Sequence, residues 1–377
     1  MKKPKCSLCG GEMKRNGHTK AGGQRWRCKA CNASTTCRYQ KNEDVFEAFL
    51  SWLFSKETQR DAGHPDRTFR QKIQECWDYW ALPPIHEERE MVIHVDGLYL
   101  TRKVVVLIAS NAQGTLGWYL ARSENSHAWA ALLRRISAPD LVVTDGGTGF
   151  EKARKRLWPQ TKVQRCLYHV FSQVRRMTTN RPNLPAGQEL YALAKDLLHI
   201  TSLLEAQIWT QRYLDWSGKW NGFLQEKTYD EHGHWVYTHV HLHRARSSLN
   251  KLLAQGVLFT YLQNPDYPST NNRIEGGINA QLRAMLCHHR GMPLMHRVKA
   301  VFWWCYMHSP SHIQTSEVLK VMPTDNNIAA IYQGMAAQEK PWENCPIGAM
   351  PSSGQSCISR PRFSPPGTDS PDTLFCL

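Results

Sequence analysis

Three acidic side chains have the surroundings that metal-ligating carboxylates need. Asp96 ends the apolar run 91–95, and Asp145 ends the run 141–144. A carboxylate at the end of a hydrophobic strand is costly unless it is paired or binds a cation. Glu275 follows much later in the chain. If the fold brings these three carboxylates together, they could hold divalent cations over a phosphodiester.

Two-metal phosphodiester chemistry explains why carboxylates would be needed at such a site. One cation activates the attacking water or hydroxyl, and the other stabilises the leaving 3′ oxygen. Gly97 and residues 146–147 keep side-chain bulk away from the two aspartates. On an α-helix, Glu275, Asn279 and Arg283 would share one face at positions i, i+4 and i+8. We therefore expect Glu275 at the edge of the core, where a ligand should be.

Four cysteines near the N-terminus have the spacing of a structural zinc site. They form two C-x-x-C pairs separated by eighteen residues: Cys6, Cys9, Cys28 and Cys31. Two such pairs on tight turns can place four thiolates tetrahedrally around Zn²⁺. The alternative, a pair of redox-active motifs, is disfavoured because no βαβ pattern surrounds them. A segment of about forty residues buries little core, so the metal would supply much of its stability.

The charge balance favours a polyanionic partner. The chain has 47 Lys and Arg against 32 Asp and Glu, a net charge of +15, and residues 1–42 hold eleven of the bases and only one acid. Such a block is typical of nucleic-acid binding, and a merely solvated basic end is the alternative. The chain has no apolar run of roughly 18 residues and no apolar segment after Met1, so neither a membrane span nor a secretory signal is expected. The twelve cysteines are expected to be reduced thiols plus a metal site.

Composition and hydrophobic periodicity divide the chain into successive parts. The predicted parts are a zinc ribbon (1–41), a helix-turn-helix (42–84), the first part of a ribonuclease-H-like α/β core (90–180), a helical insertion (181–265), the completion of the core with the Glu275 helix (266–320), and a disordered tail rich in Pro, Ser and Gly (340–377). The expected strands are 91–98, 103–110, 115–121, 140–145 and 162–166, and the expected helices of the core are 126–136, 148–157, 168–178, 271–288 and 293–308. The fold class is therefore a multi-domain mixture of α+β and α/β.

Several polar side chains are candidates for DNA contacts. In the helix-turn-helix, the second helix is predicted to run from 66 to 79 and to present side chains suited to phosphate and base edges, although a helical linker is the alternative. The full set of DNA-contact candidates is Arg25, Trp26, Arg27, Arg67, Arg70, Gln71, Gln74, Asn279, Arg283 and Arg290. The His- and Arg-rich stretch 239–246 is interpreted as a basic region near phosphate in preference to a metal site.

Three segments of the chain resemble one family. The segments 145–150, 164–169 and 270–275 read DGGTGF, QRCLYH and TNNRIE. They resemble the Mutator-like group of bacterial insertion-sequence transposases, and the N-terminal part resembles the variants of that group with a zinc ribbon and a helix-turn-helix. The resemblance covers roughly residues 1–320.

The resemblance implies a ribonuclease-H-like core in which Asp96, Asp145 and Glu275 form a DDE triad that binds Mg²⁺ or Mn²⁺. It also implies that the substrate is double-stranded DNA, which would include both the transposon ends and the target DNA. A homodimer or higher oligomer, acting on the nucleoid in the bacterial cytoplasm, would be expected because two DNA ends must be joined. Cys166 and His169 would be the family's C-x-x-H pair, which organises the site or the DNA beside it.

From the residues alone, a Cys at a strand end is commonly a small apolar residue, and two residues cannot complete a zinc site, so a structural or DNA-contacting role is favoured over a metal ligand. The function expected from the whole pattern is a transposase that binds terminal inverted repeats, cleaves a DNA strand to leave a 3′ hydroxyl, and uses that hydroxyl to attack target DNA. Two alternatives remain at this point. The chain could be a non-enzymatic DNA-binding regulator, or a metal-dependent nuclease of the same fold without strand transfer.

Overall fold

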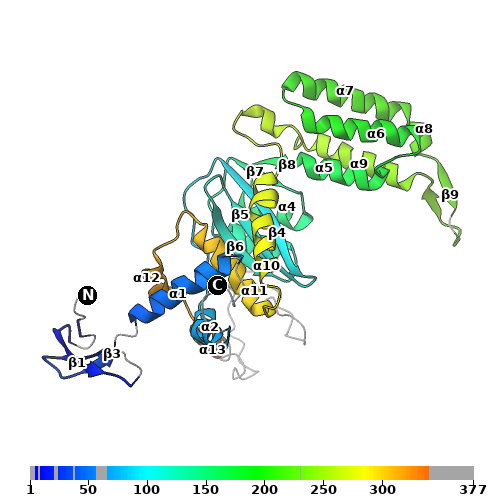
Figure 1. Cartoon of the computed structure of the whole chain (residues 1–377). Helices are drawn as coiled ribbons and strands as arrows, with labels where there is room; N and C mark the ends of the chain where they lie inside the picture. The colour runs from blue at the N-terminus through cyan, green and yellow to red at the C-terminus, as the bar shows by residue number, and fades with distance from the viewer. Residues whose placement is uncertain are drawn as a thin grey trace, which may run out of the picture. The chain divides into compact units, whose positions relative to one another are not determined.

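A computed structural model describes residues 5–6, 9–20, 24–36, 39–56, 66–229 and 231–338 (Figure 1). The expected disordered tail 340–377 and the turn expected between the two N-terminal helices lie outside these residues. Backbone contacts divide the chain into two compact units. One unit is built from residues up to 82 with 285–304 and the described part of 312–360, and the other from 83–284 and 305–311.

The second unit is built on one mixed sheet of five strands. In spatial order they are β6 (Thr115–Ala121), β5 (Val104–Ser110), β4 (Val92–Thr101), β7 (Leu141–Thr144) and β8 (Lys162–Arg165). The first three pair antiparallel, whereas β7 runs parallel to β4 and β8 parallel to β7. The predicted mixed α/β class is therefore confirmed.

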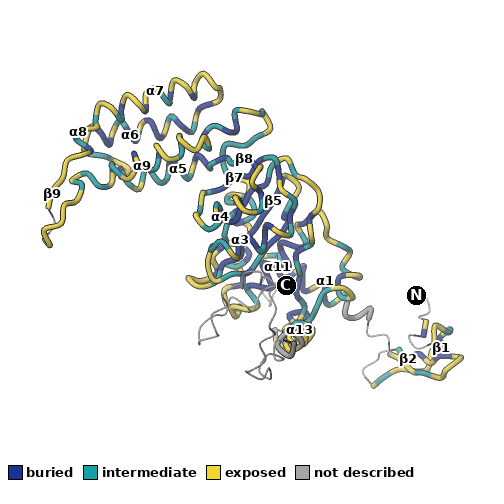
Figure 2. Tube along the Cα trace, turned by 180° about the vertical axis from the view of Figure 1, so that it is seen from behind, coloured by how far each residue is buried: buried dark blue, intermediate teal, exposed yellow. Residues whose placement is uncertain are grey.

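The strands at the centre of the sheet are buried because most of their side chains are apolar. β5 and β7 are apolar except for their last residues, Ser110 and Thr144, and have no exposed residue, which is typical of strands covered on both faces. The helices α3 (Ser126–Leu133) and α4 (Thr148–Leu157) contribute to the same core cluster, in which the Trp129 and Phe150 rings meet edge to face at 5.2 Å. Figure 2 shows the strands of this sheet as a buried centre. The sheet is thus a rigid platform for the residues at its strand ends.

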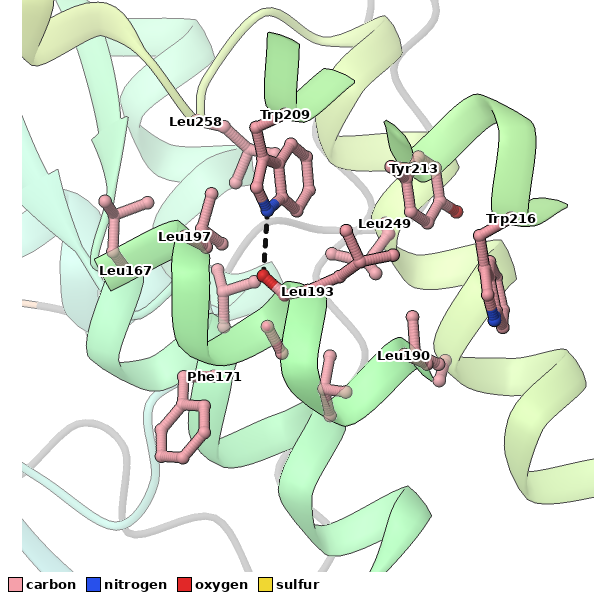
Figure 3. Packing of buried hydrophobic residues seen from close by; sticks show 14 of the residues in the cluster. Leu167, Phe171, Leu190, Leu193, Leu197, Trp209, Tyr213, Trp216, Leu249 and Leu258 are labelled. Carbon is pink, nitrogen blue, oxygen red and sulfur yellow. Dashed lines mark hydrogen bonds between the residues drawn. The ribbon is translucent and has the colours of Figure 1, made fainter. Parts of the chain in front are cut away.

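Helices follow β8 and form a second core. They are α5 (Leu167–Thr178), α6 (Pro185–Asp196), α7 (Leu203–Lys219), α8 (Asn221–Leu224) and α9 (Val240–Ala254), with a hairpin of β9 (Lys227–Tyr229) and β10 (Trp235–Tyr237) between the last two. Single-turn 3₁₀ segments lie at Leu197–His199 and Thr260–Gln263. Ser202 and Glu205 form a capping box that begins α7. Leucines from α5, α6 and α9 surround Trp209, Tyr213 and Trp216 (Figure 3).

Trp209 is expected to be the main anchor of this helical core. Its side chain is buried, its indole N–H donates to the Leu193 carbonyl at 2.8 Å, and its ring stacks on Tyr213 (Figure 3). Trp209→Ala should lower the free energy of unfolding by about 3–5 kcal/mol, because it leaves a large cavity. Ile208→Ala, an exposed neighbour on the same helix, should change it by less than about 0.5 kcal/mol. Chemical denaturation measures both, and similar losses in the two variants would contradict this assignment.

The first unit contains a small sheet and a group of helices. The sheet has β1 (Met13–His18), β2 (Gln24–Cys28) and β3 (Ser34–Thr36) in sequence order. The helices are α1 (Tyr39–Phe54), α2 (Asp66–Ile73), most of α11 (Leu294–Met307), α12 (Thr315–Val321) and α13 (Asp325–Gln338), and α10 (Ala280–His288) ends here. No helix among the described residues is long and apolar enough to cross a bilayer.

The second N-terminal helix differs from the prediction of 66–79. It is α-helical only to Ile73 and continues as a 3₁₀ segment, Gln74–Asp78. The two helices also do not stand alone, because their aromatic rings pack on α11: Phe46 lies edge to face with Trp303, and Trp77 stacks on His296 at 4.1 Å. Packing against this distant segment overrides the local helical pattern near its end.

Candidate functional site

Asp96 and Asp145 lie on neighbouring parallel strands. Asp145 is the first residue after β7, as expected. Asp96 lies inside β4 and not at its end, which corrects the prediction. However, β4 pairs with β7 only as far as His94, so Asp96 stands just beyond the point where the neighbouring strand stops. The two carboxylates therefore occupy the same edge of the sheet.

Hydrogen bonds hold both carboxylate oxygens of Asp96 and one carboxylate oxygen of Asp145. The backbone N–H of Gly97 donates to Asp96 Oδ1 at 2.9 Å, and Asn279 Nδ2 donates to Asp96 Oδ2 at 2.7 Å. The backbone N–H of Gly147 donates to Asp145 Oδ1 at 3.1 Å. A carboxylate has about four acceptor positions, so both groups keep lone pairs for a cation.

Glu275 lies on a π-helical segment, Arg273–Asn279, which precedes α10. The prediction of a regular α-helix over 271–288 is therefore wrong in its first part. A π-helix has a wider turn than an α-helix, and such segments are frequent at functional sites. Asn279 nevertheless donates to Asp96, and Glu275 lies near enough for the charges of Asp96 and Asp145 to raise its pKa. The three acids predicted from the sequence are thus brought together.

Asn271 anchors the segment that carries Glu275, and the sequence reasoning did not find this role. Its side-chain Nδ2 donates to the Val95 carbonyl and its Oδ1 accepts from His94 Nδ1, both at 2.9 Å. The Asn271 carbonyl then accepts the N–H of Glu275 at 3.1 Å. A fully buried amide that bonds β4 on one side and starts the π-helix on the other holds Glu275 beside Asp96. Its only signal in the sequence was the polar doublet 271–272 shortly before Glu275.

The carboxylates repel one another and are partly removed from water. Burial, together with the Asp145 charge, raises the pKa of Asp96 to about 6. Burial and the charges of Asp96 and Asp145 raise the pKa of Glu275 to about 7. Raised carboxyl pKa values of this origin mark a place where negative charge is concentrated and where a divalent cation would be stabilised.

Glu124 is a fourth acid at this centre that the sequence did not single out. Its carboxylate approaches Gly97 so closely that a Cβ there would lie 2.6 Å from Oε1. Burial and the charges of Asp145 and Asp96 raise the pKa of Glu124 to about 7, and the Tyr99 side chain hydrogen-bonds to it. A side chain at position 97 would therefore displace the Glu124 carboxylate from this place. No periodic pattern identifies Glu124, which lies in the loop before α3.

Arg165 is a third residue to which the sequence assigned no role. It ends β8, and its guanidinium covers Gly146, where a Cβ would lie 1.7 Å from Nη1. Gly146 has φ +84°, so glycine is favoured there by both backbone and space. Burial lowers the pKa of Arg165, and the Asp145 charge opposes that effect. Its Nε and Nη1 atoms are buried and have no hydrogen-bond partner in the described part of the chain.

The pKa shifts predict that cation binding depends on pH. Asp96, Glu124 and Glu275 have folded pKa values near 6 to 7 against about 4 in an unfolded chain. Between about pH 4 and pH 7 the folded state therefore binds more protons than the unfolded state. The stability that the protonated acids contribute to the folded state is lost as pH rises through 6 to 7. A cation that replaces the protons should restore stability most at high pH.

We therefore expect the increase in unfolding temperature produced by Mg²⁺ to be small at pH 5 and to grow up to pH 8. At a concentration about 100 times the dissociation constant, the stabilisation would approach about 2.7 kcal/mol. Thermal unfolding with and without Mg²⁺ across this pH range measures the effect. An increment that stayed constant with pH, or was larger at pH 5, would contradict a cation site at these acids.

The four N-terminal cysteines form a possible metal site, which fits Zn²⁺. Their sulfur atoms lie 3.4–3.6 Å apart in the pairs Cys6–Cys31, Cys9–Cys28 and Cys9–Cys31. Tetrahedral Zn–S bonds of about 2.3 Å place sulfurs about 3.8 Å apart, close to these values. Backbone N–H groups of residues 30 and 31 point at Cys28, and the bond from residue 31 contributes most to lowering its thiol pKa to about 6. Gly10, with φ +68°, makes the turn after Cys9.

The DNA-contact candidates divide into exposed and buried residues. Arg25, Arg27, Arg67, Arg70, Gln71, Gln74, Arg283 and Arg290 are exposed. Trp26 is buried with Met13 in the core of the ribbon, and Asn279 is fully buried against Asp96. Neither side chain is free to contact DNA in this structure, so their assignment to DNA binding is corrected. In β2 the alternation of period two directs the arginines outward and Trp26 inward.

Three of the five polar side chains in the stretch 239–246 are packed in the structure and are not free for phosphate contacts. The His239 ring stacks on Phe223 at 3.7 Å, and the His243 ring stacks on Tyr237 at 3.8 Å. Arg246 is buried. The expected basic region near phosphate is reduced to the exposed side chains His241 and Arg244.

Cys166 and His169 lie beside Glu275. His169 Nδ1 is 3.2 Å from Glu275 Oε1, and Cys166 Sγ accepts the N–H of Asn271 at 3.2 Å. The C-x-x-H pair is therefore part of the same centre as the acids and is held by the same Asn271.

Comparison with known proteins gives consistent similarities. Residues 86–221 match the family model described as "Transposase, Mutator family". The chain is similar to the "Transposase for insertion sequence element IS905" of Lactococcus lactis subsp. lactis (strain IL1403), with 33% identity over 100 residues that cover 22% of this chain and 26% of that protein. It is also similar to the "Transposase for insertion sequence element IS6120" of Mycolicibacterium smegmatis, with 35% identity over 92 residues that cover 22% and 27%.

A third similarity extends over a longer segment. The "Probable transposase for insertion sequence element ISRM3-like" of Sinorhizobium fredii (strain NBRC 101917 / NGR234) is 27% identical over 142 residues, which cover 34% of this chain and 35% of that protein. The chain therefore spans about a quarter to a third of the length of the curated relatives that it matches.

Proposed function

We propose that the chain is the DNA transposase of an insertion sequence, because residues 86–221 match the model of the Mutator family of transposases. The observation that carries the proposal is the meeting of Asp96, Asp145 and Glu275 at one edge of the sheet, where their charges act on one another. The strand order β6-β5-β4-β7-β8, with β4 and β5 antiparallel and β7 and β8 parallel to β4, supports a ribonuclease-H-like core.

The acids would hold Mg²⁺ or Mn²⁺. Hard oxygen ligands suit these cations, and the concentration of half-buried carboxylates fits their charge. Bound there, the cations would supply activation of the attacking oxygen and stabilisation of the leaving 3′ oxygen. Asn279 orients the Asp96 carboxylate, and Asn271 fixes the position of Glu275 relative to β4. The unpaired N–H groups of Arg165 suit a phosphate oxygen.

The DNA partner would be bound through the basic first unit. The exposed arginines of β2 and α2 suit phosphate contacts, and a zinc ion at the four cysteines would hold the ribbon in shape. Terminal inverted repeats would be the specific substrate and target DNA the second one. A homodimer or larger assembly, acting at the nucleoid in the bacterial cytoplasm, would hold the two ends together for joining.

A strand-transfer assay tests this proposal against its two rivals. The full chain would be supplied with Mn²⁺, a target plasmid and terminal-repeat DNA, either intact or already ending in a 3′ hydroxyl. Joined product is expected. Nicking of intact repeats without joining would favour a nuclease, and repeat binding with neither reaction would favour a DNA-binding regulator. Repeat DNA with a 3′ dideoxy end serves as the matched control, because it cannot attack the target.

A further inference from the structure

We propose that Cys166, His169 and Glu275 form a second zinc site, separate from the cysteine cluster of the ribbon and sharing Glu275 with the acidic centre. The ligand atoms of the three residues lie within 4.8 Å of one another. The proposal goes beyond transposition and does not depend on it. Two residues were too few for a metal site in the sequence, and the fold supplies the third from a segment about a hundred residues later.

Two of the three ligand atoms are buried and have no hydrogen-bond partner within the described residues. They are His169 Nδ1 and Glu275 Oε1, and they face each other at 3.2 Å without hydrogen-bond geometry. A buried polar atom without a partner is costly. Tetrahedral ligands at about 2.0–2.1 Å from Zn²⁺ stand about 3.3 Å apart, close to this separation. One cation between the two atoms would therefore satisfy both.

The third ligand atom lies among backbone N–H groups that favour its anionic form. Cys166 is the N-cap residue of α5. Its sulfur accepts a hydrogen bond from the backbone N–H of Asn271 at 3.2 Å, and the backbone N–H groups of His169 and Tyr168 also act on it. Burial raises the pKa of the Cys166 thiol, and these N–H groups oppose that effect. A bound cation deprotonates a coordinating thiol outright, so the free thiol does not exclude the site.

The ligand set selects the kind of metal. Thiolate and imidazole favour Zn²⁺ over Mg²⁺, whereas the nearby Asp96 and Asp145 offer only oxygen. Three protein ligands leave the fourth position of a tetrahedral ion for water. Because Oε1 of Glu275 would be held by this ion, the other oxygen of the same carboxylate would remain for the cations at the two aspartates. The zinc would thereby position Glu275.

The zinc content of the full chain tests the inference. Protein purified with excess Zn²⁺ and dialysed to remove loosely bound metal is expected to contain two zinc ions per chain by native mass spectrometry. Cys166→Ala and His169→Gln should each lower the content to one. Cys28→Ser should remove the ribbon zinc instead, and Cys76→Ala, a buried cysteine outside both groups, should leave two.

Two variants of the site are used because one of them could fail to fold. His169 is half-buried, so His169→Gln removes a ligand without a large cavity even if Cys166→Ala fails to fold. One zinc in the wild type, or two in His169→Gln, would overturn the proposal. DNA joining is not measured here, so an inactive chain with two zinc ions would overturn only the proposed function, and an active chain with one would overturn only this site.

Discussion

The Asp145→Asn variant is expected to lose strand cleavage by at least about a thousandfold. A cation that stabilises the transition state by several kcal/mol accounts for a factor of this size, since about 1.4 kcal/mol corresponds to tenfold. Asparagine keeps the shape of the side chain and can still accept the N–H of Gly147 through Oδ1. Only the charge and the metal-binding oxygen are lost.

The same substitution should stabilise the metal-free chain. The Asp145 charge helps to raise the pKa of Asp96, Glu124 and Glu275, so its removal relieves repulsion above pH 7. Loss of activity together with a higher unfolding temperature would distinguish a functional acid from a structural one. Asp140→Asn is the matched control, since Asp140 lies just before the opposite end of β7 and pairs with Arg89 on the surface. Cleavage by Asp145→Asn at the rate of Asp140→Asn would disprove the assignment.

The sequence predicted the acidic residues because each is marked locally. Asp96 and Asp145 follow apolar runs, and these runs form β4 and β7, whose parallel pairing brings the acids to one edge. The helix face of Glu275 was predicted with the spacing of an α-helix. The π-helical turn at 273–279 is not visible in such a pattern, because it depends on Asn271 bonding β4. A hydrogen bond between two residues that are 176 positions apart leaves no pattern in the neighbouring sequence.

Glu124 and Arg165 were missed for a related reason. Neither follows a periodic pattern, and each reaches the site by filling the space above a glycine, Gly97 or Gly146. Trp26 and Asn279 show the converse error, because a side chain suited to DNA by type was assigned to it without knowledge of its burial. Composition and spacing predict which chemistry is present, whereas tertiary packing decides which side chains are available for it.

Removal of zinc from the ribbon is expected to unfold residues 5–36 while the rest of the chain stays folded. The ribbon's buried core consists of Cys6, Met13, Trp26 and Cys28. Four buried side chains offset little of the conformational entropy that is lost when the ribbon is ordered. Structural zinc contributes about 10–16 kcal/mol in comparable small domains, so the metal decides whether the ribbon folds.

Cys28→Ser tests this without a chelator, and so leaves the metal proposed at Cys166 in place. Trypsin should then cut rapidly after Arg25 and Arg27, which are exposed but held in β2 when the sheet is formed. Cys287→Ser, an exposed cysteine outside both groups, should retain the protection of the wild type. If Cys28→Ser remained as resistant as this control, the ribbon would be stabilised by something other than zinc. Rapid cleavage with an unchanged unfolding temperature of the remaining chain would show that the ribbon folds as a separate, metal-dependent part.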